Sequence, residues 1–475
     1  MVTRASGVHA IDTTEQTLAN KSALLRKELG LRDLVLMQVL FVVGLGWIGT
    51  AAKLGPSHVV FWFVAVTLFY LPSAVVVIYL TTLMPLEGGL YQWAKIGLSD
   101  LAGFLVAWNL WLYVIVNTSE VGLQTATYLS YSLGTDARWM AGSRPLIVVL
   151  SSMLVGSLAI ISALGLGVGK WLHNAGGMLI LTLFAAMVVL PVLNYARGSL
   201  PPLQPFSLAL PSLTLLNLNI LGKMGFGALG GFDYVAIMAG ECRDPVKTIG
   251  RSVIIAVPII AGMFILGTAS VLCFIRPADV DLIGPIPQVL DAGARSLGMV
   301  TGVVPIVIMT IAVVRVAQAS VNFTGSARLP MVAGWDDLLP AWFSRLHPRR
   351  RTPVNSILFV AAVTLGVAIA SVMGVGEQEA FQLLNNASGI FYALTYLALF
   401  AIPILGLRTA PPLWLRVVAC SGFLMTLLYV VLSIFPIVPV INQVSFTAKI
   451  VLVILVCNGV GAVIFLAGER RRVKG

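Results

Sequence analysis

Charged residues are scarce in this 475-residue chain, and their scarcity excludes an ordinary water-soluble fold. Only 10% of the residues are charged and 58% are hydrophobic. Soluble globular chains carry about 25% charged residues. So few charges cannot cover the apolar surface that a soluble fold of this length would expose. A lipid bilayer solvates such a surface, so the composition predicts an integral membrane protein.

Cysteine and histidine are also few, with four of each, and neither is arranged as a metal site. The cysteines lack metal-ligand spacing, so we interpret them as reduced packing residues. The sequence contains no Gly-Lys-Ser/Thr loop that would bind a nucleotide phosphate, which argues against ATP-driven transport. Because no catalytic set stands out either, we expect no cofactor and no enzymatic activity.

Long apolar stretches are what the chain has in abundance. Each membrane span needs about 20 apolar residues, and about twelve such stretches fit here. Alternating strand patterns are absent, so we expect an all-α, polytopic membrane protein. The expected spans lie near residues 32–53, 57–83, 100–133, 144–164, 171–193, 214–239, 251–275, 298–323, 354–374, 380–405, 413–436 and 446–467.

The net charge of +11 is explained by topology. With the N-terminus inside, the cytoplasmic segments hold about three times as many Lys and Arg residues as the external ones, as the positive-inside rule requires. We therefore expect a multi-pass protein of the plasma membrane with both termini in the cytoplasm. The lipid bilayer is its expected macromolecular environment, and a nucleic-acid partner is not expected.

Two glycine-rich windows, residues 44–50 and 225–233, lie five spans apart. Glycine weakens a helix by up to about 1 kcal/mol per residue relative to alanine, so both spans are expected to unwind near the membrane centre. Close helix packing is the alternative interpretation. Paired breaks at this spacing are typical of transporters built from two inverted five-helix repeats. The expected parts are residues 1–31 (cytoplasmic tail), 32–200 (first repeat), 201–405 (second repeat) and 406–475 (two further helices).

Four segments carry a resemblance to a known family. They are GWIGT at 46–50, PLEGGLYQW at 85–93, GGFD at 230–233 followed by AGE at 239–241, and SARL at 326–329 followed by DLLP at 337–340 and RTP at 351–353. Together they resemble the amino acid–polyamine–organocation superfamily of permeases, which share the leucine-transporter fold. The resemblance implies ten core helices in two inverted halves, discontinuous helices 1 and 6, and alternating access around a midplane site.

The resemblance also implies which residues bind the substrate between spans 1, 3, 6 and 8. Its carboxylate would meet backbone amides of the first break, and its amino group would meet carbonyls of the sixth. Two departures from the family pattern are Ala51, where glycine is usual, and Asp233, where glutamate is more common. The implied substrate-binding residues are Gly46, Trp47, Ile48, Gly49, Thr50, Ala51, Phe226, Gly227, Ala228 and Leu229.

Four charged residues fall inside expected spans, where each is a functional candidate. They are Glu120, Lys223, Asp233 and Arg315. Static pairing, such as Glu120 with Arg315, is one interpretation. Otherwise Glu120, Lys223 and Asp233 are candidates for coupling or gating, and a carboxylate that takes up a proton would suit proton coupling. Arg315 would bind an acidic substrate group or take the place of a coupling cation, and its fixed charge disfavours a sodium site.

The leading functional hypothesis is a secondary active permease for amino acids, either proton-coupled or exchanging. The alternative within the same class is a carrier of polyamines or other organic cations, against which Lys223 and Arg315 argue mildly. An alternative of another class is a membrane sensor or channel that keeps this fold without transport. A carrier with two six-helix halves is disfavoured because the longest expected cytoplasmic loop follows span 8 rather than span 6.

Overall fold

The computed structural model describes residues 25–44, 46–85, 88–133, 135–137, 139–200, 205–280, 285–298, 303–335, 338–373, 377–405, 411–435 and 442–474. Regular structure in these ranges is helical, apart from one isolated bridge between Leu29 and Cys242. The all-α prediction is therefore confirmed.

Nine helices of the described part are long and apolar enough to cross a membrane. Some are continuous, and others join shorter elements through a bend or a π-helical turn. They are formed by α4 (His58–Ala65), the π-helical turn η2 (Val66–Tyr70) and α5 (Leu71–Leu83); α7 (Asp100–Ser119) and α8 (Val121–Ser132); α10 (Arg144–Leu164); α11 (Leu166–Ala196); α14 (Pro245–Phe274); α16 (Val303–Ser326); α19 (Glu377–Leu405); α20 (Leu413–Ser433); and α21 (Gln443–Lys474).

A shorter apolar helix and two broken spans complete the set of about twelve spans expected from the sequence. The shorter helix is α18 (Val354–Met373). The broken spans are span 1, made of α2 (Leu31–Val42) and α3 (Trp47–Ala52), and span 6, made of α12 (Leu215–Gly222), the π-helical turn η4 (Lys223–Gly227) and α13 (Phe232–Ile237).

The remaining elements are short and connect the spans. They are the helices α6 (Leu90–Gly97), α9 (Trp139–Gly142), α15 (Pro285–Ser296) and α17 (Leu329–Trp335), with 3-10 turns at Gly55–Ser57, Thr135–Ala137, Ala239–Glu241 and Pro277–Asp279.

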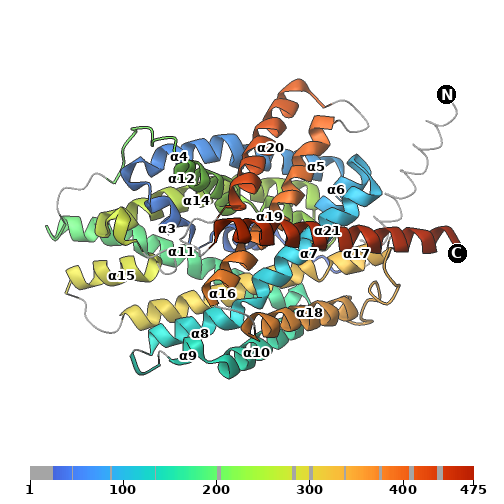
Figure 1. Ribbon diagram of the computed structural model, residues 1–475, viewed down its shortest axis with the longest axis horizontal. Helices are drawn as coiled ribbons and strands as arrows, with labels where there is room; N and C mark the ends of the chain where they lie inside the picture. The colour runs from blue at the N-terminus through green and yellow to red at the C-terminus, as the bar shows by residue number, and fades with distance from the viewer. Residues whose placement is uncertain are drawn as a thin grey trace.

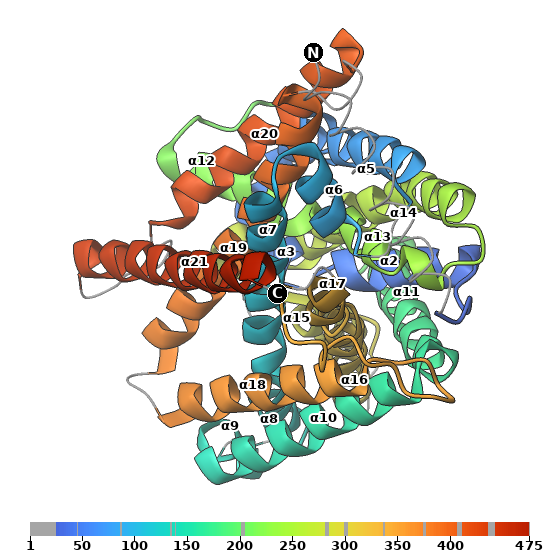
Figure 2. The same cartoon turned by 90° about the vertical axis from the view of Figure 1, so that its right-hand side faces the viewer.

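The long helices run roughly along one common direction (Figure 1). Helices α6 and α17 lie at one end of this bundle, where α21 also finishes, and α15 lies at the other. Seen along the bundle, α10 and α18 pack side by side, far from α5 and α14 (Figure 2). We call the two ends the α6–α17 end and the α15 end.

Spans 1 and 6 are both interrupted, as the glycine windows predict. In span 1 the helix ends at Val42, and a new one begins at Trp47. In span 6 the break lies at residues 230–231, where Gly231 has φ +147°. Residues 226–229, where we expected the break, are helical instead, because the π-helical turn η4 passes directly into a further helical stretch at 228–229.

Span 3 bends in the middle, and the bend places a charged residue. Helix α7 ends at Ser119 and α8 begins at Val121, so Glu120 occupies the turn between them.

The two π-helical turns face each other: the rings of Phe69 in η2 and Phe226 in η4 have centroids 5.6 Å apart. Such π-helical turns are rare in proteins, and those that occur are often found at functional sites.

Gly231 offers a direct test of the span-6 break. A Cβ atom there would lie 2.6 Å from Val42 Cγ2 and 2.7 Å from Phe41 Cδ1, in addition to the strained φ. Overpacking of this kind costs about 1–3 kcal/mol. Gly231→Ala should therefore lower the thermal unfolding temperature of the protein in detergent.

The matched control is Gly262→Ala in α14, where the added Cβ meets no atom within 4 Å. That variant should unfold at or slightly above the wild-type temperature, since alanine favours the helix by about 1 kcal/mol. Equal unfolding temperatures for Gly231→Ala and the wild type would contradict the described break.

Candidate functional site

The side chain of Trp47 lies between the two broken spans. A Cβ atom on Gly44 would lie 2.5 Å from Trp47 Cδ1, and one on Gly227 would lie 2.9 Å from Trp47 Cη2. Trp47 itself is half-buried. The indole therefore fills a space that exists only because both facing positions are glycine. The structure thus brings residues of the first and sixth spans, expected as one site, into contact.

Helix α3 presents its first-turn amides just after the span-1 break. Trp47 N donates to Gly44 O at 3.3 Å, and Thr50 N donates to Gly46 O at 3.2 Å. The amides of Ile48 and Gly49 lie between them, in the turn where a helix supplies no partners of its own. The side chains of Ile48 and Ala51 are buried. Ile48 and Ala51 can therefore offer a ligand their backbone groups rather than their side chains.

In span 6, Phe226 is embedded in aromatic rings. Its ring centroid lies 5.4 Å from that of Tyr392, 5.2 Å from Tyr396 and 4.8 Å from Tyr429. Its carbonyl oxygen already accepts a hydrogen bond from Gly230 N at 2.9 Å. Of the carbonyls expected to meet an amino group, that of Phe226 is therefore engaged within the protein. Gly227, Ala228 and Leu229 are the other three.

Asp233 lies just after the span-6 break and is fully buried. It lies in the first turn of α13, where the helix dipole favours a negative charge. The Tyr392 hydroxyl donates to Asp233 Oδ1 at 2.8 Å. Next to it, the Tyr396 hydroxyl accepts a hydrogen bond from Gly231 N at 2.7 Å. Two tyrosines of α19 thus hold the carboxylate and the broken backbone together.

A polar chain joins span 3 to span 8. Gln124 Nε2 donates to Glu120 Oε2 at 3.2 Å, and Gln124 Oε1 accepts from Arg315 Nε at 3.1 Å. Arg315 Nη1 donates to Gln318 Oε1 at 3.0 Å. The direct Glu120–Arg315 pair that we considered is therefore replaced by a link through Gln124.

The chain continues from Gln318 to the span-1 break. Gln318 Nε2 donates to Leu40 O at 2.8 Å and to Val43 O at 3.0 Å. Gln124 and Gln318 were missed by sequence reasoning, which searched the spans only for charged residues. An uncharged amide inside an apolar span is the signal that could have found them.

Lys223 does not join this network. It starts the π-helical turn η4 and is half-buried. Among the described residues no carboxylate lies within ion-pair distance of it. The structure therefore brings neither Glu120 nor Asp233 to this cation.

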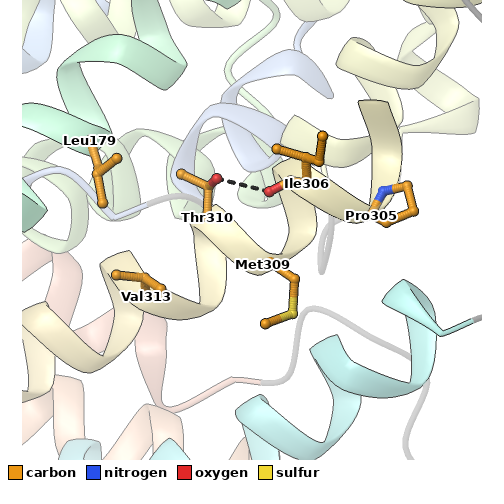
Figure 3. Close-up of a pocket in the computed structure, with 6 residues that line it drawn as sticks. All are labelled: Leu179, Pro305, Ile306, Met309, Thr310 and Val313. Carbon is orange, nitrogen blue, oxygen red and sulfur yellow. Dashed lines mark hydrogen bonds between the residues drawn. The ribbon is translucent and has the colours of Figure 1, made fainter. Parts of the chain in front are cut away.

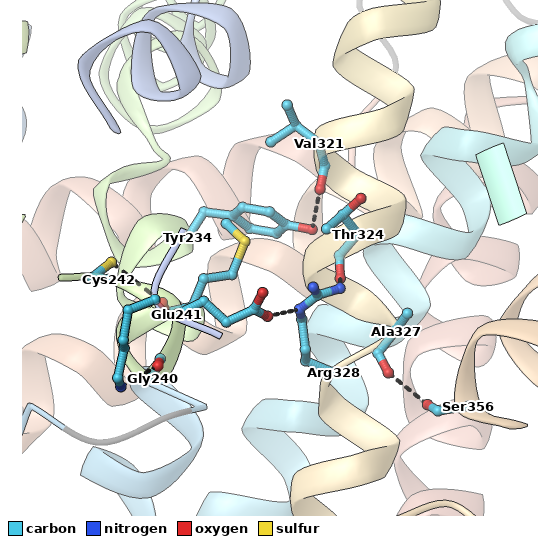
Figure 4. Close-up of polar contacts among 11 residues, drawn as sticks. Tyr234, Gly240, Glu241, Cys242, Val321, Thr324, Ala327, Arg328 and Ser356 are labelled. Atoms are coloured by element: carbon cyan, nitrogen blue, oxygen red, sulfur yellow. Dashed lines mark hydrogen bonds and ion pairs between the residues drawn. The ribbon is translucent and has the colours of Figure 1, made fainter. Parts of the chain in front are cut away.

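A buried ion pair lies near the α6–α17 end (Figure 4). Arg328 Nε lies 2.6 Å from Glu241 Oε1, and their side chains are 1% and 8% exposed. Arg328 Nη1 also donates to Thr324 O at 2.7 Å. The backbone oxygen of Glu241 accepts bonds from the amides of Glu28 and Leu29 at 3.0 and 3.1 Å. The partner of Glu241 therefore lies just beyond the end of α16.

One pocket among the described residues is lined by no residue of the two breaks. It has a volume of about 380 Å³ and is lined by Leu179 of α11 and by one face of α16 (Figure 3). Thr310 supplies the hydroxyl in its lining, and that hydroxyl already donates to Ile306 O at 2.8 Å. An open apolar pocket of this kind suits lipid chains rather than a polar substrate.

Comparison with known proteins supports a transport role. The protein-family model described as "Amino acid permease" matches residues 29–457 of this chain. A branched-chain amino acid permease, BcaP of Bacillus subtilis, is 24% identical over 79% of this chain and 83% of its own. The large neutral amino acids transporter small subunit 2 of Oryctolagus cuniculus is 23% identical over 78% and 69%. An uncharacterized transporter of Legionella pneumophila is 24% identical over 80% and 81%.

The contribution of the Glu241–Arg328 pair to stability can be tested by mutation. Breaking a buried pair by removing one partner costs about 3–5 kcal/mol, because the other charge stays buried alone. Glu241→Ala should therefore strongly lower the thermal unfolding temperature in detergent. Asp291→Ala, which removes the partner of exposed Arg295, should leave it unchanged. A small effect of Glu241→Ala would show that the pair does not hold this end.

Proposed function

Because the chain belongs to the amino acid permease family, we propose that this transporter carries amino acids across the plasma membrane by alternating access. The proposal is carried by one observation: the broken spans 1 and 6 meet at Trp47, whose ring packs against both Gly44 and Gly227. Substrate sites of transporters with paired discontinuous helices lie at such breaks. The two expected repeats, residues 32–200 and 201–405, would move against each other around this site.

The proposed substrate-binding groups are mainly backbone. Amides at the start of α3 suit a carboxylate, because an N-terminal turn carries unpaired donors and partial positive charge. Carbonyls of Gly227, Ala228 and Leu229 suit an ammonium group. A site with both kinds of group favours a zwitterion, which is what an α-amino acid is. Trp47 and Phe226 would line the space beside it.

We propose that coupling uses a proton or a second amino acid rather than sodium. Two carboxylates, Glu120 and Asp233, lie inside spans and are held by uncharged partners, Gln124 and Tyr392. Asp233 is the stronger candidate, because it can take up a proton without leaving a linked cation uncompensated, whereas Glu120 is linked through Gln124 to Arg315. Arg315 keeps its charge and would disfavour sodium nearby.

A carrier of polyamines or organic cations is the second candidate. Its site should present net negative charge, whereas Lys223 has no carboxylate within ion-pair distance among the described residues. A sensor or channel of the same fold is the third candidate, and transport kinetics separate it from a carrier. We further propose that the α6–α17 end, with both termini, faces the cytoplasm.

Counterflow distinguishes a carrier from a channel or sensor. Proteoliposomes loaded with an unlabelled amino acid should accumulate the labelled form transiently above its equilibrium level. A channel or a sensor gives no such overshoot. The screen should include neutral, acidic and basic amino acids, with putrescine as the polyamine probe. Overshoot with putrescine and with no amino acid would replace the leading proposal by the second candidate.

A pH gradient tests the coupling carboxylate. With acid outside, uptake into proteoliposomes should exceed uptake at equal pH, since protons then enter with the substrate. Asp233→Asn should remove this stimulation while exchange of one amino acid for another persists. Asp291→Asn, at the α15 end, should retain the stimulation. Uptake that needs sodium and ignores the gradient would contradict proton coupling.

A further inference from the structure

Backbone oxygens gather where α2 ends inside the membrane. The last carbonyls of any helix lack partners within the helix. They also carry the partial negative charge of the helix C-terminus, and α2 has no basic residue in its last turn. In transporters with broken helices, unwound carbonyls and half-helix C-terminal ends are ligands for a coupling cation. The end of α2 is therefore a place where either a cation or an internal donor is needed.

An internal donor occupies this place. Gln318 Nε2 donates to Leu40 O at 2.8 Å and to Val43 O at 3.0 Å, and the residue is only 6% exposed. The orientation of the carboxamide follows from its neighbours. Arg315 can only donate, so it faces Oε1, and the two carbonyls can only accept, so they face Nε2.

The positive charge behind the amide is fixed in position. Arg315 binds Gln318 through Nη1 and Gln124 through Nε, and Gln124 is tied to Glu120. An alkali cation at the α2 carbonyls would need the space that the Gln318 amide already occupies. It would also meet the guanidinium of Arg315. Both steric and electrostatic effects therefore exclude it.

We propose that the Gln318 carboxamide, held by Arg315, takes the place of a coupling cation at the span-1 break, so that transport needs no alkali cation. The inference rests on the proposed transport function. Gln318 is a positioning residue: it holds the backbone of span 1, whose continuation α3 carries the amides proposed to bind substrate.

Gln318→Glu turns this idea into a measurable gain of function. The variant keeps the shape of the side chain and an acceptor for Arg315. It replaces the amide donor by a carboxylate oxygen that faces two carbonyl oxygens. These oxygens repel one another unless a small cation lies between them, and together they form a set of oxygen ligands that suits such a cation. The variant should therefore acquire a dependence on sodium that the wild type lacks.

The experiment measures amino acid exchange in proteoliposomes with sodium chloride or choline chloride on both sides. Wild-type rates should be equal in the two salts. Gln318→Glu should be roughly tenfold slower than wild type in choline, because two buried carbonyls lose their donor. Sodium should restore a substantial part of that rate. The control is Gln38→Glu in α2, because the Gln38 amide donates to Ser252 Oγ rather than to the carbonyls at the break. The exchange rate of this variant should not depend on sodium.

Three results would overturn the proposal. They are a wild-type rate that falls in choline, a Gln318→Glu rate equal to wild type in choline, and a slowed, folded Gln318→Glu protein that is indifferent to sodium. If Gln318→Glu does not fold, Gln318→Met decides, since it removes the donor at similar size. Loss of exchange in both salts then supports the proposal, and a wild-type rate overturns it.

A binding readout separates this proposal from the proposed function. If no amino acid is exchanged by the wild type, the transport proposal fails, but the occupancy of the break is still measurable. Sodium should then raise the thermal unfolding temperature of Gln318→Glu relative to choline, and leave that of the wild type unchanged. Equal responses of the two proteins would overturn the role assigned to Gln318.

Discussion

A helix broken inside a membrane exposes backbone donors and acceptors that no water can satisfy, and this constraint organises the centre of the molecule. The acceptors freed at span 1, Leu40 O and Val43 O, are met by the amide of Gln318. At span 6 the amide of Gly231 is met by the hydroxyl of Tyr396. One partner comes from α16 and the other from α19. Two unbroken helices thus stabilise two broken ones.

Other central features follow from these two contacts. The Gln318 carboxamide needs a donor on its other side, and Arg315 supplies it. Arg315 in turn requires acceptors in an apolar span, which explains the link through Gln124 to Glu120. At span 6 Tyr396 accepts from the broken backbone and Tyr392 donates to Asp233, and the rings of both tyrosines pack against Phe226. At the α6–α17 end, the buried Glu241–Arg328 pair links the region after span 6 to the region after α16.

The sequence was sufficient for the overall plan and for the existence of both breaks, because glycine content and span spacing are local properties. It was insufficient for their exact register. The glycine window covered residues 225–233, and the family resemblance placed the substrate-binding carbonyls at 226–229. In the structure a π-helical turn includes Gly225 and Gly227, and the chain departs from helix only at Gly230 and Gly231. The choice of polar partners was also beyond the sequence. Glu120 reaches Arg315 through Gln124 rather than directly, and Glu241 pairs with Arg328, which lies far along the chain. Only tertiary packing determines that choice.

The central claim is that the meeting point of spans 1 and 6 binds an amino acid. The most direct test is a thermal-shift screen of the purified protein against amino acids, since a ligand that binds only the folded state raises its stability. We expect at least one amino acid to raise the unfolding temperature of the wild type. The shift should be lost in Gly227→Val, whose Cβ would press on the Trp47 ring, and retained in Gly262→Ala. An equal shift in Gly227→Val would contradict a site at this place.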